Sequence, residues 1–146
     1  MIEYIEEILI RDLKVLRNEI SSFENEENLW KTLPGITNRA GVLCSHICGN
    51  LNHFIGAILA DSGYIRIRDK EFSETGIPKE NLIDLIDQTE KMIVTSLKTI
   101  SHDTLKLKYP VPFSGKEVKT GELLLILIAH LSYHLGQINY LRRLLN

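Results

Sequence analysis

The amino-acid sequence predicts an all-α protein in which four long helices form a bundle. Apolar residues recur at steps of three and four in four separate segments, and this spacing lines them up along one side of a helix. No segment shows the sustained alternation of apolar and polar residues that is typical of a strand. At 146 residues, the chain is long enough for one core and too short for two, so residues 1–146 are expected to form a single domain.

The first two helices are expected on either side of a turn. Helical spacing of apolar residues predicts the first helix over residues 2–22. Pro34 then marks a turn, because it breaks the helical pattern. The second helix is predicted over residues 38–61, with a side-chain oxygen of Thr37 or Asn38 as its N-terminal cap.

The last two helices are expected to be separated by long connections. Residues 64–79 are polar and are predicted to be irregular, and a connection of this length allows a crossover between helices. The third helix is predicted over residues 79–101. A second irregular connection follows the third helix, and Pro110 within it prevents that helix from continuing. The fourth helix is predicted over residues 120–144.

Composition and charge disfavour several kinds of partner. Apolar residues make up 44% and charged residues 25% of the chain, as in an ordinary globular protein. The formal net charge is −2, and lysine and arginine are spread along the chain. This distribution offers no basic surface for nucleic acid or an anionic membrane, so we expect neither partner.

The chain is expected to be soluble and cytoplasmic. Glu6 and Arg11 interrupt the segment that would be the apolar region of a signal peptide. The longest apolar run, residues 123–129, is much shorter than the roughly 20 residues of a membrane-spanning helix. Cys44 and Cys48 match neither a zinc-binding pair nor a disulfide framework, so we expect free thiols in the core.

Polar residues interrupt the apolar side of two predicted helices. Because each residue advances a helix by about 100°, these residues share one side with the leucines and isoleucines around them. They are His46, Asn50 and His53 on the second predicted helix, and His130, His134 and Gln137 on the fourth. Tyr133 borders the same side and is a candidate hydroxyl donor to a cavity. Buried imidazoles and amides without partners are costly, so these groups must bind one another, water or an ion.

Two interpretations of these histidines stay open at this point. His130 and His134 are one turn apart, so both imidazoles point to one spot, and a third imidazole from a facing helix would complete a metal site with an open position. Such a set of nitrogens suits Zn, Ni, Fe or Mn. The alternative is a hydrogen-bonded core network without metal, in which His46 pairs with Asn50 and His130 pairs with Gln137.

Two stretches of the chain carry a family resemblance. They are SHICGNLNHFIGAILADSGYIRIRDKEF, which contains H-x-x-GNL and GY-x-R-x-R-D-x-EF, and AHLSYHLGQINYLRR, which contains H-x-x-x-H-x-GQI. With these motifs the chain resembles the DinB-like (DinB/YfiT) superfamily, in particular its branch of uncharacterised domains. The resemblance implies a bundle of up-down-down-up topology with a crossover connection. It also implies a divalent metal held by His46, His130 and His134, with His53 as a second candidate or a supporting group.

The resemblance also implies a class of activity. Characterised relatives include metal-dependent enzymes that use low-molecular-weight thiols, such as thiol S-transferases and maleylpyruvate isomerases. We therefore expect a thiol transferase that acts on a small electrophile, with Arg66 and Arg68 holding a carboxylate of the thiol or the substrate. The alternative for these arginines is a solvated loop in which they pair with Asp69 and Glu71. The resemblance further implies that the protein forms a homodimer.

Two other functions fit the same residues. One is a metal-dependent hydrolase, in which an activated water is the nucleophile. The predicted helices place no inward Asp or Glu near His46 or His130 to act as its base, which counts against hydrolysis. The other is a non-catalytic bundle whose histidines are structural and whose helices mediate dimerisation.

Overall fold

Four long helical segments dominate the computed structural model, which describes residues 1–146. They are α1 (Ile2–Ser21), α2 (Ala40–Leu51) with its π-helical continuation η2 (Asn52–Leu59), α4 (Lys79–Leu97) and α5 (Thr120–Leu145). No strand is present. The predicted all-α fold class is therefore confirmed.

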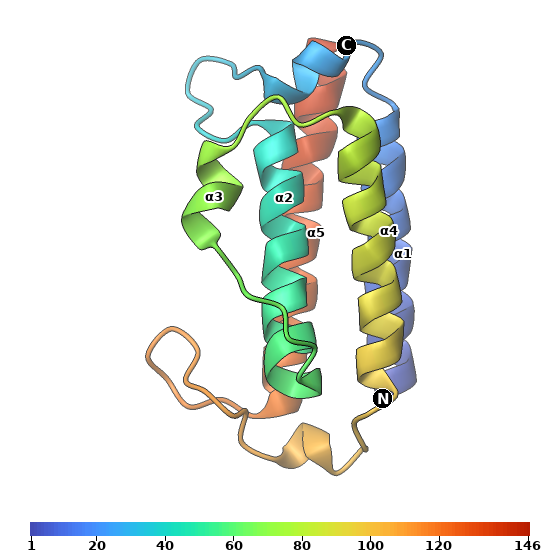
Figure 1. The fold of residues 1–146 in the computed structure, drawn as a ribbon, viewed down its shortest axis with the longest axis vertical. Helices are drawn as coiled ribbons and strands as arrows, with labels where there is room; N and C mark the ends of the chain where they lie inside the picture. The colour runs from blue at the N-terminus through green and yellow to red at the C-terminus, as the bar shows by residue number, and fades with distance from the viewer.

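The long helices lie side by side around one core (Figure 1). α1 contacts α4 and α5 along its length, and α2 contacts the same two helices, so α1 and α2 lie across the bundle from each other. In Figure 1, α1 and α5 run from bottom to top, whereas α2 and α4 run from top to bottom. The segment after η2 therefore runs along the outside of α2, antiparallel to it, and returns to the top of the view before α4 begins.

Three short helices occur outside the four predicted helices. They are η1 (Glu26–Trp30), α3 (Arg68–Ser73) and η3 (Thr104–Lys106). The prediction that residues 64–79 are irregular throughout is wrong, because α3 lies within them. A helix of six residues has too few turns to show a period of apolar residues. α3 packs against α2 and brings one acidic side chain to it, as described below.

Some predicted helix ends also differ from the structure. α2 begins at Ala40, and its N-cap is Arg39 without a side-chain hydrogen bond, so neither Thr37 nor Asn38 caps it. α4 ends at Leu97 rather than at residue 101. The backbone of η2 is π-helical, a change that side-chain spacing does not reveal.

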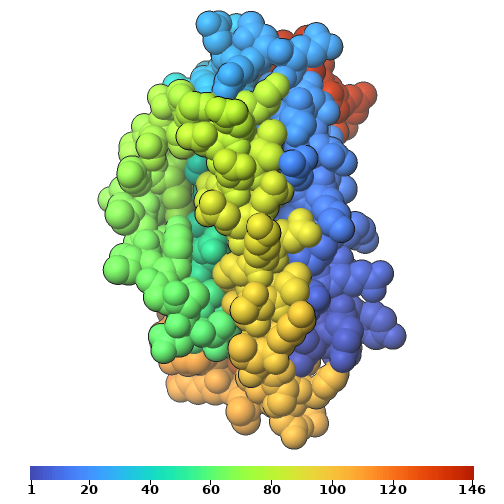
Figure 2. Space-filling view, turned by 45° about the vertical axis from the view of Figure 1, so that its right-hand side comes forward, coloured from blue at the N-terminus to red at the C-terminus, as the bar shows by residue number.

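α2 is strongly apolar because it is buried in the core. α2 is covered by neighbours on most sides, and Figure 2 shows it only as a narrow strip between α4 and the segment that leads to α3. Cys44 and Cys48 are free and buried inside it.

The connection before α5 is anchored to the bundle by Tyr109, which is fully buried and donates a hydrogen bond to the carbonyl of Phe54 at 2.7 Å. This connection forms one wall of the candidate site.

Two helical segments are long and apolar enough to cross a membrane, judged by length and composition. They are Ala40–Leu59 and Thr120–Leu145. The most apolar window of the first is 61% buried within the bundle, as is typical of a core helix. The corresponding window of the second is 28% buried. Two such helices are weak evidence of a membrane span, because core helices of soluble proteins pass the same test.

Candidate metal centre

Three imidazoles meet between α2 and α5. His130 Nε2 lies 3.1 Å from His46 Nε2 and 3.1 Å from His134 Nε2. One ring nitrogen from each residue lies within 4.8 Å of the other two. His46 comes from α2, whereas His130 and His134 are one turn apart on α5. Two nitrogens bound tetrahedrally to one zinc ion are about 3.3 Å apart, so the spacing suits a shared metal.

The outer nitrogens of two rings are already occupied. His46 Nδ1 lies 3.1 Å from Glu71 Oε1, and His134 Nδ1 lies 2.7 Å from Gln137 Oε1. A neutral imidazole that donates through Nδ1 keeps a lone pair on Nε2. The Nε2 atoms of His46 and His134 are then acceptors that both face His130, so the three inner nitrogens share at most one proton. This donor set fits a divalent metal better than it fits a complete hydrogen-bond network.

The surroundings keep the imidazoles of α5 uncharged. Burial lowers the pKa of His130 to about 4, and the nearby His134 and His46 contribute to this shift. Burial also lowers the pKa of His134, although its hydrogen bond with Gln137 acts in the opposite direction. A neutral imidazole is the form that ligates a metal. Both residues are therefore ready to bind without first losing a proton at neutral pH.

Glu71 on α3 belongs to the candidate site, and its position beside His46 was missed by sequence reasoning. It is 8% exposed and binds His46, and it accepts hydrogen bonds from Arg66 Nε and Nη2, both at 2.8 Å. Burial raises the pKa of Glu71, but the hydrogen bonds from Arg66 and His46 outweigh burial and lower it overall. An ionised carboxylate therefore holds His46 from behind. The expectation that no carboxylate lies near His46 is wrong, because Glu71 comes from α3 rather than from a long helix.

Gly49 makes room for this carboxylate. A Cβ atom on Gly49 would lie 2.0 Å from Glu71 Oε2, which is too close for any side chain. Gly49 is three residues after His46, so both lie on the side of α2 that faces α3. The H-x-x-GNL and R-x-R-D-x-EF motifs thus meet in space. The occurrence of both motifs in one chain is the sequence signal that could have led to Glu71.

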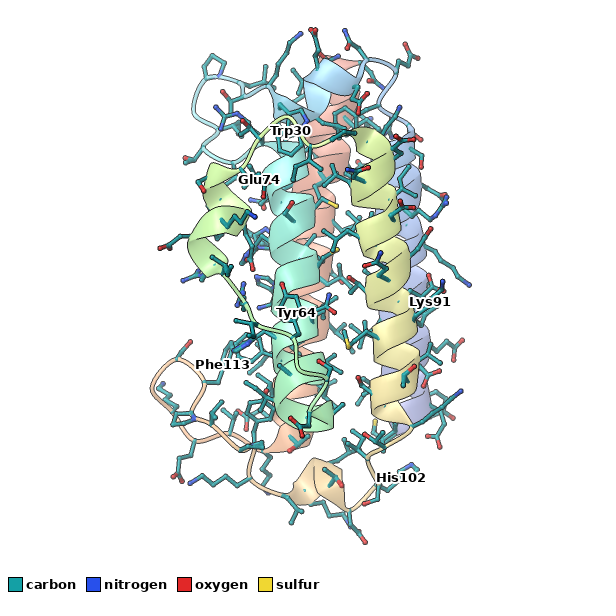
Figure 3. The ribbon with its side chains drawn as sticks, viewed as in Figure 1. Trp30, Tyr64, Glu74, Lys91, His102 and Phe113 are labelled. Atoms are coloured by element: carbon teal, nitrogen blue, oxygen red, sulfur yellow. The ribbon has the colours of Figure 1, made fainter.

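A cavity of about 380 Å³ opens beside His46 and His130. Its apolar wall includes Phe54 of η2 and Phe113 of the connection before α5, whose ring centroids are 5.3 Å apart. Figure 3 labels Phe113 on this connection. The remaining polar residues in the wall are Asn50, Arg66, Arg68 and Ser114. A larger cavity of about 520 Å³ lies between the start of α2 and the end of α5; no histidine lines it, but Gln137, which binds His134, does.

The two arginines differ in their contacts. Arg66 is bound by the carboxylate of Glu71 through two nitrogens, so the expected pairing with Glu71 forms, but it is buried rather than solvated. Arg68 forms no ion pair and lies over the ring of Phe72, with 5.7 Å between its guanidinium carbon and the ring centroid. Both line the cavity.

The amides do not form the predicted core network. Asn50 is buried in the cavity wall and its side-chain oxygen has no hydrogen-bond partner, so the predicted pair with His46 is absent. Gln137 binds His134 rather than His130. The reason is that Glu71 already occupies His46 Nδ1, whereas His130 turns Nε2 toward the other two rings.

His53 and Tyr133 lie outside the three-histidine group. His53 packs its ring against Phe54, with 4.8 Å between centroids, and it lines neither the smaller nor the larger cavity. Tyr133 is 66% exposed, and its hydroxyl accepts a hydrogen bond from Gln137 at 3.3 Å. The expectation that Tyr133 borders the cavity is wrong, because its position on α5 turns it outward.

The fold and the site define an all-α bundle with a three-histidine candidate metal centre. The family described as "Protein of unknown function (DUF1572)" matches residues 2–146, and the chain belongs to this family. The match confirms the expectation that the chain belongs to a family of uncharacterised domains. No curated protein matches the chain.

Proposed function

We propose that this protein is a DinB-like, divalent-metal-dependent enzyme that transfers a low-molecular-weight thiol to a small electrophile. His46, His130 and His134 would hold the metal, which we expect to be Zn, Ni, Fe or Mn. The observation that carries the proposal is the convergence of their Nε2 atoms beside a cavity. When bound, a divalent metal supplies a Lewis acid that lowers the pKa of a thiol.

The residues around the centre have separate roles in this reaction. Glu71 and Gln137 fix the ring orientations of His46 and His134. Phe54 and Phe113 exclude water from the cavity in which the electrophile binds. The thiolate sulfur forms a bond to the electrophilic carbon, the bond to the leaving group breaks with its electron pair, and the thiol proton passes to solvent.

The geometry favours transfer of a thiol over hydrolysis. A hydrolase needs a base that accepts a proton from water, and no Asp or Glu lines the cavity. Glu71 is the nearest carboxylate, but Arg66 and His46 occupy both of its oxygens. A thiolate is already the reactive form and needs no further base in the site.

Metal content and activity with thiols test the proposal. Protein purified without an affinity tag is expected to contain a near-stoichiometric transition metal and to consume a chromogenic electrophile with bacillithiol, glutathione or mycothiol. His130→Ala is expected to lose both properties. His102→Ala is the matched control, because the side chain of His102 is 61% exposed and lies outside the centre. Hydrolysis of the electrophile without thiol would instead support a hydrolase, and protein without metal would contradict both enzymes.

A further inference from the structure

We propose that the cavity beside the three histidines binds a small carboxylate with an apolar body, and that Arg68 and Asn50 make its polar contacts. The inference deepens the proposed function and rests on it, because it assigns a ligand class to the cavity of the same site. It depends on the charge of the cavity wall, on an amide without a partner and on two aromatic rings.

The charge of the wall selects an anion. Arg66 and Arg68 line the cavity, and no Asp or Glu does. The charge of Arg66 is balanced by Glu71, which lies behind it, whereas Arg68 has no acidic partner. One positive charge is therefore uncompensated at the cavity. Arg68 is also exposed, so its guanidinium group is accessible to a ligand that enters from solvent, and a guanidinium group binds a carboxylate through two parallel hydrogen bonds.

Asn50 indicates a second polar contact. The residue is 6% exposed, and its buried side-chain oxygen has no hydrogen-bond partner in the protein. Buried amides are rarely left in this state, because they lose their bonds to water without replacing them. Asn50 lies in the wall of the cavity, so a ligand that donates a hydrogen bond, such as a secondary amide, would supply the missing partner.

The rest of the wall sets the shape of the ligand. Phe54 and Phe113 form an apolar surface, together with Leu127 of α5. A volume of about 380 Å³ is near the lower end of the range for sites that bind small molecules. An N-acylated amino acid with an apolar side chain combines the carboxylate, the amide and the apolar body in one small ligand.

Two ligands that differ by one carboxylate test this inference. N-acetyl-L-phenylalanine carries the carboxylate, and N-acetyl-2-phenylethylamine lacks it. Calorimetric titration of metal-free protein is expected to show binding of the acid at least about tenfold tighter than that of the neutral amide, because the neutral amide lacks a hydrogen-bonded charge pair. Neither ligand has a thiol, so the measurement does not depend on metal or on turnover.

Variants assign the contacts. Arg68→Gln is expected to weaken binding of the acid by about tenfold and to leave the neutral amide unchanged. Arg143→Gln is the control, because this exposed arginine lies over Tyr140 on α5 and outside the cavity. Asn50→Ala is expected to weaken both ligands to the same extent, with folding checked by thermal unfolding.

The outcomes separate this inference from the proposed function. Equal binding of the two ligands, or an unchanged affinity of the acid in Arg68→Gln, would overturn the inference even if the protein holds metal and transfers thiols. Selective binding of the acid that depends on Arg68 supports the inference even if no thiol transfer is found.

Discussion

Glu71 is the residue that ties the metal centre to the rest of the protein. Its carboxylate lies 3.1 Å from His46 Nδ1, and Arg66 holds both carboxylate oxygens. An imidazole gains basicity and a fixed orientation when a carboxylate accepts its outer N–H. His46 therefore presents Nε2 to the centre because of a residue 25 positions later in the chain.

Replacement of Glu71 is expected to weaken metal binding. In Glu71→Gln the side chain keeps its shape but loses the charge that holds His46 and Arg66, so the affinity for zinc should fall by about 10- to 100-fold. Competition with a chromogenic chelator measures this change. Glu74→Gln is the matched control, because Glu74 lies just beyond α3 and pairs only with the exposed Lys70. Equal affinity of Glu71→Gln and the wild type would contradict the role given to Glu71.

Gly49 gives an independent test of the same contact. In Gly49→Ala the new methyl group would lie 2.0 Å from Glu71 Oε2, so the carboxylate must move away from His46. We expect a loss of zinc affinity similar to that of Glu71→Gln, and a fall of about 1–3 kcal/mol in the free energy of unfolding. Gly136→Ala on α5 is the control, because no atom lies within 4 Å of the added methyl group. Normal zinc affinity in the Gly49→Ala variant would show that Glu71 does not need its present position.

The sequence predicted the three histidines but not their support. His130 and His134 share a side of one helix by spacing alone, and His46 lies on the apolar side of another. The bond between His46 and Glu71 depends on how a connecting segment folds back onto α2. The spacing of apolar residues along one helix does not reveal such a contact, although both of its residues belong to the two sequence motifs.

At the scale of elements, α1 and α5 are joined by a partly buried ion pair near their C-terminal ends. Glu19 of α1 binds Arg142 and accepts a hydrogen bond from Asn139 at 2.7 Å. Burial raises the pKa of Glu19, but the hydrogen bonds from Arg142 and Asn139 outweigh it and lower the pKa overall. The ionised carboxylate is thus preferred in the folded protein, and it links two helices that are far apart in sequence.

This ion pair predicts a pH dependence of stability. A lowered pKa in the folded state means that the stabilisation is present above the unfolded value of about 4.3 and is lost as the pH falls through the folded value. At pH 7, Glu19→Gln should lower the free energy of unfolding by about 1–2 kcal/mol, and the difference from the wild type should shrink below about pH 4. Urea unfolding at several pH values measures both effects. Asp103→Asn, whose side chain is 89% exposed, should show neither, and a constant difference at all pH values would exclude the ion pair as the cause.

The elements that the sequence predicted correctly are the ones with several turns. α1 and α5 follow their predicted ranges within one residue, because each repeats its apolar stripe many times. α3 was missed because six residues hold only one buried side chain, Glu71, and that side chain is polar. The change to a π-helix at Asn52 alters the backbone hydrogen bonds rather than the apolar spacing, so no sequence pattern indicates it.

At the scale of the whole molecule, the candidate centre bridges helices that are not joined directly in the chain. His46 belongs to α2 and its partners belong to α5, and 84 residues separate His46 from His130. A metal that binds all three side chains would therefore restrain two helices at once. Because such a ligand binds the folded chain and not the separated helices, it must stabilise the bundle as a whole.

Metal binding is therefore expected to raise the melting temperature. At a free zinc concentration of about 100 times the dissociation constant, binding adds about 2.7 kcal/mol to the free energy of unfolding. For a chain of this size, this corresponds to a rise of about 5–10 °C in Tm, which calorimetry measures with zinc and with a chelator. His130→Ala should lose the rise because it removes the nitrogen nearest to both others, whereas His102→Ala should keep it. An equal rise in His130→Ala would mean that zinc stabilises the fold from another site, since the three imidazoles of α2 and α5 could no longer act together.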